Sequence, residues 1–377
     1  MKIVHIGPCQ LPILYPLGGA NERRIRETAA CQARLGAQVI VYSAEEKRGS
    51  VRYEGAEIRA IACRRSGVLR AAEFMVQSLR DARREKPDII HFHTQPEGAA
   101  FTRLFAPGCG ARTILSFDFF EFRRGRRNPL FPWYRRALRS FSALLPVSEY
   151  CRRESSQYWS IPSEEMQVLY NGVSLQQFAP DPQGAAERRL ALGIKPGECV
   201  LLYVGRVCEQ KGTDLLVESF ARLRAERPEV RLVVAGPNGQ FGHEGSNPIT
   251  RRLEQAGGTY LGPVDEKILR SVYSMADIFV LPTRTEEMFG MAAIEAQACG
   301  RPVVCSDQGG LPEVVPATSG LLFRAGDGES LTAQLRILAA DGAMRRRFEE
   351  AALVNARRFS WETITAQLDH VYAAVAA

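Results

Sequence analysis

The sequence predicts an α/β protein built from two doubly wound domains in tandem. Short apolar strands alternate with helices, a pattern typical of parallel sheets whose two faces are covered by helices. The alternation starts again after a polar, proline-containing stretch near the middle of the chain. With 377 residues, of which 45% are hydrophobic, the chain exceeds the ~250–300 residues at which single cores usually stop growing, so two domains are expected.

The first half opens with the strand KIVHIG and a loop that carries the adjacent glycines Gly18 and Gly19. A helix is expected from Glu22 to Leu35, because Gly36 follows directly and glycine commonly ends helices. A second helix over residues 70–84 precedes the strand IIHFH, and the strands ILSF and ALLPVS come later. This recurring strand–helix order predicts a parallel sheet.

The second half repeats this order after the segment APDPQGAAERRLALGIKPGE, which we interpret as the linker. Its expected strands are CVLLYVGR, VRLVVAG, GTYLGPV, DIFVLPT, PVVCS and GLLF, with helices at GTDLLVESFARLRAE and ILRSVYSMA. We therefore expect a first domain over residues 1–185, a second over 186–360, and a closing helix over 361–377 that packs back on the first domain.

Composition and charge limit the function classes. Residues 1–185 hold 27 basic and 18 acidic side chains, a balance of +9, whereas the remainder holds 22 and 24, a balance of −2. The first half should therefore face an anionic partner: a membrane surface, a phosphorylated acceptor or nucleic acid. The nine cysteines lack zinc-type spacing, which indicates reduced, buried thiols.

The start of the chain, MKIVHIGPCQLPILYPLGG, lacks the layout of a signal peptide, and no apolar run approaches the ~20 residues of a membrane span. A cytoplasmic protein is expected, and peripheral attachment at the inner face of the membrane stays open. The basic and aromatic segment FRRGRRNPLFPWYRRALRSF would suit an anionic membrane. The alternative is a solvated helix whose aromatic side chains cover the core. Nucleic acid fits less well, because no recognised binding module is present.

A candidate phosphate site follows the first strand of the second half. The strand ends near Val204, Gly205 turns the chain, and Arg206 and Lys211 flank the next helix start. An arginine fork and a lysine near a helix N-terminus suit a diphosphate, although the same residues could be an ordinary solvated turn. Neither a P-loop nor a G-x-G-x-x-G motif is present, which disfavours ATPases and dinucleotide dehydrogenases.

Two carboxylates, Glu287 and Glu295, stand eight positions apart in EEMFGMAAIEAQACGRPVV. They could act as a general acid and base, or they could hold the hydroxyls of a sugar or ribose. The wider stretch, EEMFGMAAIEAQACGRPVVCSDQGGLPEVV, resembles the signature of the retaining family 4 glycosyltransferases. Further segments are similar to that family: LGGANERRIRETAACQARLG, DIIHFH, LPVSEYCRRE, VLYNGVSLQQF, GRVCEQKGTDLL and SMADIFVLPTRTEEMFG.

The resemblance implies the GT-B fold, two Rossmann-like domains with the active site in the cleft between them. It implies that Glu287 holds donor-sugar hydroxyls, that Glu295 holds the ribose hydroxyls, and that Arg206 and Lys211 neutralise the diphosphate. The implied donor-binding set also contains backbone positions: Gly18, Gly19, Gly205, Gly262, Val264, Phe289, Gly290 and Met291. UDP is the expected donor nucleotide and GDP the second choice.

The resemblance further implies transfer with retention of anomeric configuration, in which the leaving diphosphate takes the acceptor's proton. Many relatives carry a histidine before Asp118, but this chain has Phe117 there. Asp118 and His93 are therefore the substitutes expected near the reacting centre, and Asn21, Asp118 and Glu121 the expected acceptor-binding residues. No cofactor or metal is expected, because no Asp-x-Asp lies near the site.

The expected acceptor is a saccharide, a lipid-linked compound or a small molecule. Two alternatives stay open. One is a sugar phosphorylase or synthase on the same fold, and the other is a catalytically impaired partner that binds sugar nucleotides, which Phe117 would explain.

Overall fold

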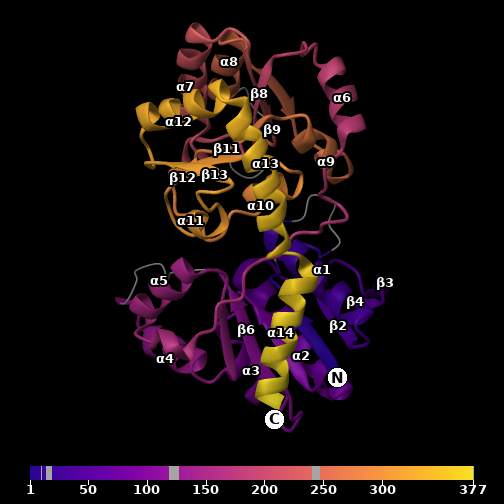
Figure 1. Ribbon diagram of the computed structural model, residues 1–377. Coiled ribbons are helices and arrows are strands. Elements are labelled where there is room, and N and C mark those ends of the chain that lie inside the picture. Colours follow the sequence, from indigo (N-terminus) through magenta and orange to yellow (C-terminus); the bar gives the residue numbers. More distant parts are fainter. Residues whose placement is uncertain (10, 14–18, 119–126, 240–246, 377) are drawn as a thin grey trace. The chain divides into compact units, whose positions relative to one another are not determined.

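The computed structural model describes the chain except for residues 10, 14–18, 119–126, 240–246 and 377, and it separates into two compact units (Figure 1). The first unit contains residues 1–172 and 361–377, and the second contains residues 173–360. Among the described residues, no helix is both long and apolar enough to cross a bilayer.

The first unit has a seven-stranded sheet in its described part, with the order β3-β4-β2-β1-β5-β6-β7. Its strands are β1 (Lys2–Ile6), β2 (Gln38–Glu45), β3 (Gly49–Tyr53), β4 (Ala56–Ala62), β5 (Ile89–His93), β6 (Arg112–Phe117) and β7 (Ala143–Pro146). All neighbours pair in parallel except β3, which pairs antiparallel with β4 at the edge. The sequence pattern did not predict this edge hairpin.

The helices of the first unit are α1 (Ala20–Arg34), α2 (Gly67–Glu85), α3 (Gly98–Phe105), α4 (Phe131–Leu138), α5 (Glu149–Trp159) and α14 (Trp361–Ala376). The amphipathic α1 buries Ile25 and Ala29 against Val39 and Val41 of β2. The last helix, α14, contributes Leu368 and other apolar side chains to a core cluster with strand residues of β1, β5, β6 and β7. The beginning and the end of the chain thus share one core (Figure 1).

The second unit has a six-stranded, wholly parallel sheet in its described part, with the order β10-β9-β8-β11-β12-β13. Its strands are β8 (Cys199–Val204), β9 (Val230–Ala235), β10 (Thr259–Gly262), β11 (Ile278–Leu281), β12 (Val303–Ser306) and β13 (Gly320–Phe323). Its helices are α6 (Pro182–Ala191), α7 (Thr213–Glu226), α8 (Pro248–Gln255), α9 (Glu266–Ser274), α10 (Met291–Ala298), α11 (Leu311–Val314), α12 (Gly328–Ala340) and α13 (Gly342–Arg357).

The boundary between the units differs from the predicted one at residue 185. The chain enters the second unit at Val173, and the predicted linker contains the helix α6. Residues 177–191 belong to the second unit because they bond to α9: the Asp181 N–H donates to Ser274 Oγ over 3.1 Å, and Arg188 Nε donates to Ser271 Oγ over 3.1 Å. Polar composition suggested a linker, whereas α6 is a surface helix capped by the Asp181 carboxylate.

In both sheets the order of the strands reverses at one strand, while the neighbouring strands stay parallel. In the second unit, β8 lies between β9 and β11, and the chain builds outward from β8 on both sides. In the first unit, β1 holds the same place between β2 and β5. In open parallel sheets, ligands bind beyond the carboxyl ends of the strands at such a point, so the loops after β1, β5, β8 and β11 are the positions to examine.

Candidate functional site

The loops after β8 and β11 bring the predicted phosphate and sugar residues of the second unit together. Lys211, in the short 3-10 helix η3 (Glu209–Lys211), donates from Nζ to Glu287 Oε2 over 2.5 Å. Both side chains are about one-quarter exposed, each 23%. An ion pair with this exposure remains accessible to a ligand, and neither charge has to be fully desolvated.

The two loops are fixed to each other by their backbones. The Arg284 N–H donates to the Gln210 carbonyl over 3.0 Å, and the Gly310 N–H, in the loop after β12, holds the Glu287 carbonyl over 2.8 Å. Gly212 has a φ of +67°, and a Cβ there would lie 1.8 Å from the Pro282 carbonyl oxygen. The close approach of these loops therefore requires glycine at position 212.

Arg206 follows β8 at the same edge of the sheet. The buried Tyr203 hydroxyl donates to the Arg206 carbonyl over 2.7 Å. Burial raises the pKa of Tyr203 above its ordinary value, the charge of Glu287 raises it further, and the charge of Arg206 opposes this.

The helix α10 begins at this point with an N-terminus that has no side-chain cap. Its N-cap, Gly290, has a φ of +95°, and a Cβ there would lie 2.5 Å from Leu311 Cδ2. Phe289 and Gly290 are buried, and Met291 is half-buried. Uncapped N–H groups at a helix start favour phosphate or sugar oxygens, which is the role predicted for these three positions.

Glu295, on α10, is buried at 4% exposure rather than open to solvent. The Tyr273 hydroxyl donates to its Oε2 over 2.8 Å. The sequence pattern identified the carboxylate but missed this tyrosine, which lies on the buried face of the amphipathic helix α9. Tyr273 holds one carboxylate oxygen in a fixed position and partly offsets its desolvation.

The predicted base-binding segment follows β10. Gly262 accepts from the Gly236 N–H over 2.7 Å, and the Tyr260 hydroxyl donates to the Gly236 carbonyl over 2.8 Å. Gly262 has a φ of +71° with open space around its Cβ position, and Val264 is half-buried. The segment is therefore a partly open backbone surface two strands away from β8.

Of the predicted residues in the first unit, Gly18 and Glu121 lie outside the described residues. Gly19 is the N-cap of α1, and Asn21 is half-buried in its first turn. Phe117 ends β6 at 2% exposure, so its ring lies in the core. Asp118 follows it with a side chain that is 34% exposed, and its Oδ1 lies 3.6 Å from Arg24 Nη1.

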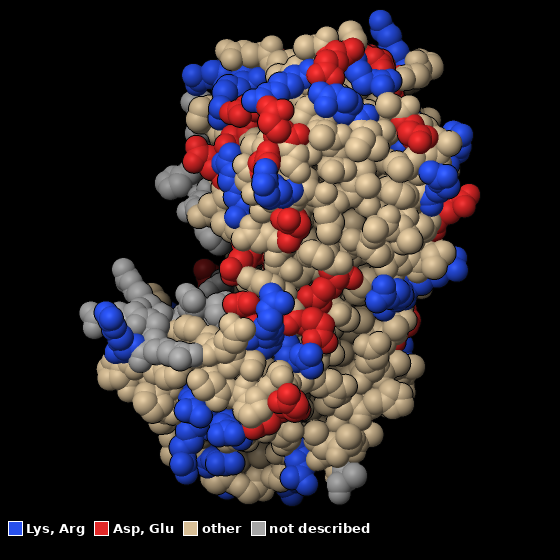
Figure 2. Space-filling view, turned by 60° about the vertical axis from the view of Figure 1, so that its left-hand side comes forward, with Lys and Arg blue, Asp and Glu red and all other residues tan. Residues whose placement is uncertain are grey.

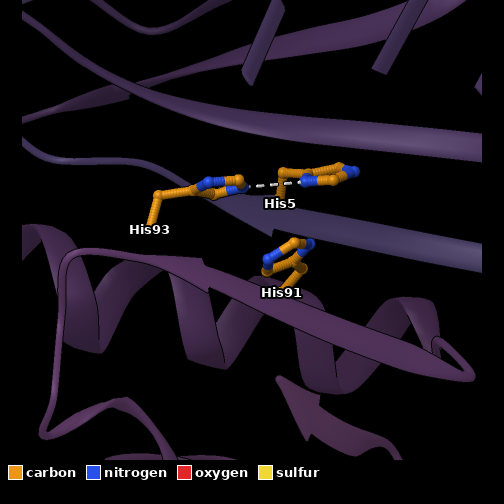
Figure 3. Close-up of side chains that lie close together, drawn as sticks. All are labelled: His5, His91 and His93. Atoms are coloured by element: carbon orange, nitrogen blue, oxygen red, sulfur yellow. Dashed lines mark hydrogen bonds between the residues drawn. The ribbon is translucent and has the colours of Figure 1, made fainter. Parts of the chain in front are cut away.

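His93 lies in the core, at 1% exposure, in a cluster with His5 and His91 (Figure 3). These side chains come from β1 and β5, where His5 and His91 are paired in register. His93 Nε2 and His5 Nδ1 are 3.0 Å apart, and the rings of His91 and His93 stack at 4.3 Å. This burial disfavours the predicted catalytic role of His93, which stays a prediction.

The three histidines are also the one group in the described residues whose ligand-type atoms lie close enough for a metal ion. Five of their six ring nitrogens already have hydrogen-bond partners, which include Gln32, Ser116 and Tyr372. Because Gln32 Oε1 accepts from His5 Nε2 over 2.8 Å, the His5 Nδ1 accepts and the His93 Nε2 donates. The cluster is therefore a hydrogen-bonded part of the core, and of its six ring nitrogens only His93 Nδ1 has no hydrogen-bond partner among the described residues.

The basic surplus of the first half lies partly around a hollow of about 530 Å³ between β3, β4 and α2. The charged side chains that line it are Arg48, Arg59, Arg80, Arg84 and Asp81. Arg59 is paired with Glu57 and Asp81, so acidic groups balance part of this charge. Figure 2 shows one face of the molecule, where basic side chains are interspersed with acidic ones.

The described part of the basic and aromatic segment packs on its own unit. Phe131 stacks on the buried Trp159 at 4.8 Å, and Trp133, at 41% exposure, contacts Tyr134 edge-on at 4.8 Å. These contacts favour the packing alternative over a membrane surface. Peripheral membrane contact stays a prediction.

Comparisons with known proteins agree with this arrangement. Residues 186–354 match the family model described as glycosyl transferases group 1, and residues 18–177 match the model described as glycosyltransferase family 4. A D-inositol 3-phosphate glycosyltransferase from Segniliparus rotundus is 36% identical over 211 residues, which are 55% of this chain and 46% of that protein. A second, from Catenulispora acidiphila, is 39% identical over 211 residues, 53% of this chain and 48% of its own length. The chain thus spans about half the length of the curated relatives it matches.

Solved structures share the fold over nearly all of the chain. The sucrose-phosphate synthase of Thermosynechococcus elongatus has a TM-score of 0.80 at 20% identity and covers 100% of this chain and 99% of its own. HepE of Anabaena, solved with UDP and glucose, has a TM-score of 0.79 at 17% identity and covers 99% of this chain and 100% of its own. Two doubly wound sheets in one chain, as in the GT-B fold, are therefore the architecture of this protein.

Proposed function

Because this chain belongs to the family 4 glycosyltransferases, we propose that it moves a hexosyl or N-acetylhexosaminyl group from a nucleotide sugar to an acceptor hydroxyl. The observation that carries the proposal is the Lys211–Glu287 ion pair at the edge of the second sheet where its strand order reverses. A cation and a carboxylate at that edge complement the two parts of a sugar diphosphate, which are the anionic phosphates and the sugar hydroxyls. The cation attracts the phosphates and the carboxylate accepts from sugar hydroxyls.

The donor is a UDP-sugar, with a GDP-sugar as the second choice. HepE was solved with UDP-glucose, and an Escherichia coli protein described as trehalose-6-phosphate was solved with UDP-2-fluoro glucose, both on this fold. Arg206 and Lys211 neutralise the diphosphate, together with the N–H groups at the start of α10. Glu287 accepts from the sugar, Glu295 from the ribose, and the backbone over residues 262–264 contacts the base.

The acceptor is a phosphorylated small polyol, within the wider class of saccharide, lipid-linked and small-molecule acceptors. The relatives reported above carry the name D-inositol 3-phosphate glycosyltransferase. The net positive charge of residues 1–185 also favours an anionic acceptor. Asn21 and Asp118 bind it from the first unit.

Transfer proceeds with retention and without a metal. The bond from the sugar C1 to the diphosphate oxygen breaks, the acceptor oxygen bonds to C1 on the same face, and the acceptor's proton passes to the departing diphosphate. No protein base is consumed in this step, which is compatible with the apolar Phe117. Arg206 and Lys211 each lower the barrier by roughly 2–4 kcal/mol, by analogy with single oxyanion donors.

The test is release of UDP from UDP-glucose and UDP-N-acetylglucosamine, with and without D-inositol 3-phosphate. Lys211→Met should lower turnover on the order of 100-fold. Glu287→Ala should weaken turnover while UDP binding persists, whereas Glu295→Ala should weaken UDP binding itself. Lys195→Met, at an exposed position in the same unit, is the control.

Three outcomes contradict the proposal. If free phosphate but no nucleotide supports sugar exchange, the protein is a phosphorylase. If UDP-sugars bind without any turnover, it is a binding partner. Equal loss of both ligands in the two glutamate variants, with folding preserved, removes the division of roles between them.

A further inference from the structure

Arg24 is a buried cation whose hydrogen bonds are incomplete. Its side chain, on α1, is 6% exposed. Nη1 donates to Asn171 Oδ1 over 3.3 Å, but Nε and Nη2 are buried and have no hydrogen-bond partner among the described residues. Buried guanidinium groups normally have all their donors paired, because an unpaired buried donor is destabilising.

The carboxylate within ion-pair distance of this cation in the described residues is that of Asp118, at 3.6 Å. The two groups differ in environment, since Arg24 is enclosed and Asp118 is one-third exposed. Burial lowers the pKa of Arg24, and the charge of Asp118 opposes this most strongly. The carboxylate thus has one side toward a fixed positive charge and another toward solvent.

Asp118 also has the right location for a substrate contact. It follows β6, at the carboxyl edge of the first sheet, and the preceding Phe117 offers only a buried ring. In doubly wound sheets this edge carries the ligand-binding groups. Arg24 comes from a different element, α1, and so it can fix the carboxylate relative to the helix that also carries Asn21.

A purely structural role explains these observations poorly. A guanidinium that only held the fold would have its donors paired, and an exposed aspartate would be stable in water without it. Among the described residues, Arg24 keeps two buried donors without a partner, which is an arrangement that normally destabilises a fold. Such residues are concentrated where geometry serves a ligand.

We propose that Arg24 is a positioning residue for glycosyl transfer: it holds the Asp118 carboxylate in the orientation that receives the acceptor hydroxyl. This rests on the proposed function. Asp118 accepts a hydrogen bond from the hydroxyl and orients its oxygen toward the sugar C1. The proton still passes to the departing diphosphate, so Asp118 remains a carboxylate throughout.

The experiment compares Arg24→Met, Arg24→Lys, Asp118→Asn and the Arg24→Met/Asp118→Asn double variant. The assay is transfer from UDP-glucose to D-inositol 3-phosphate, with UDP-glucose hydrolysis by water and UDP binding measured in parallel. Arg24→Met should lower kcat/KM for transfer by about 10- to 100-fold, because a small misplacement of a reacting group has effects of this size. Hydrolysis and UDP binding should stay within about twofold, and Arg24→Lys should recover part of the rate.

The double variant isolates the coupling. If Arg24 acts through Asp118, the double variant should be no slower than the slower single variant, because both substitutions remove the same contribution to kcat/KM. Multiplied losses would overturn the proposal. Arg26→Met is the matched control on the same helix, because Arg26 is paired with Glu27 and lies over the Tyr53 ring. Its transfer rate should equal that of the wild type.

Thermal unfolding tests the proposal independently of activity, even if UDP-glucose and D-inositol 3-phosphate are not the substrates. The Tm of the Arg24→Met variant should lie within about 2 °C of the wild-type Tm, or above it. If Arg24 served only to stabilise the fold, its replacement would lower the Tm by several degrees. A large drop for Arg24→Met would overturn the positioning role. Wild-type protein that neither binds UDP nor releases it from any UDP-sugar would instead refute the proposed function, which is a separate result.

Discussion

Acidification should destabilise the first unit, because the three clustered histidines are uncharged in the folded state. Burial lowers the pKa of His5 from 6.5 to about 4, and the hydrogen bond that His5 donates to Gln32 Oε1 opposes this shift. Burial, and then the charges of neighbouring groups that include Arg24, hold the pKa values of His91 and His93 well below their ordinary value. The unfolded chain therefore binds protons between pH 6.5 and about 4 that the folded unit does not bind.

The sign and size follow from this difference. Stability from the neutral cluster is fully present above pH 6.5 and is lost as the pH falls toward 4. His5 alone should remove about 2 kcal/mol of unfolding free energy between neutral pH and about pH 5. His91 and His93 act in the same direction.

The assay is urea unfolding followed by tryptophan fluorescence at several pH values. All three tryptophans of the chain, Trp133, Trp159 and Trp361, belong to the first unit, so the signal reports that unit. His5→Gln should flatten the pH dependence by about the 2 kcal/mol assigned to His5. His370→Gln, at an exposed position on α14, should leave the dependence unchanged. A pH-independent wild type, or parallel curves for His5→Gln and the wild type, would refute the reasoning.

Further predictions concern the second unit. Gly212→Ala should destabilise it by at least about 2 kcal/mol, because the new methyl group would clash with the Pro282 carbonyl and residue 212 has a positive φ. Gly262→Ala should add only backbone strain of about 1 kcal/mol, because the space around its Cβ position is open. Chemical denaturation compares the stabilities of the two variants. Tyr273→Phe should lower stability by roughly 1–3 kcal/mol and weaken UDP binding, since Glu295 loses a donor; retained UDP affinity by calorimetry would contradict the role given to this pair. EDTA should leave turnover unchanged, and activity restored only by added Mg²⁺ or Mn²⁺ would show that a metal is required.

The sequence predicted the alternation of strands and helices, and the structure brings several of the residues predicted for the second-unit site to one edge of the sheet. Arg206, Lys211 and Glu287 could be found because each follows a recognisable apolar strand, and loops after neighbouring parallel strands meet at one edge. The boundary at residue 185 was misplaced because α6 is polar and exposed, so its composition is that of a linker. The edge strand β3 was missed for the same reason, since its residues are largely exposed.

Side-chain burial was harder to predict than position. His93 was predicted to lie near the reacting centre and Glu295 to bind the ribose, and the side chains of both are nearly inaccessible to solvent. Their partners, His5 and Tyr273, come from distant parts of the sequence, and a linear pattern gives no sign that these hydroxyl and imidazole groups meet. Arg24 was overlooked in the same way, because an arginine in a helix rich in charge looks like a solvated residue.

The shared core of α14 and the first sheet has a consequence for how the protein is made. Leu368 and Tyr372 pack against strand residues near the start of the chain, such as Ile3 and Ile89. During synthesis, the first unit must therefore wait, with this apolar face of its sheet uncovered, until the last helix leaves the ribosome. The second unit is continuous in sequence and can fold before the first is complete. A chain truncated before residue 361 would contain the whole second unit and a first unit whose sheet exposes an apolar surface, a substrate for chaperones.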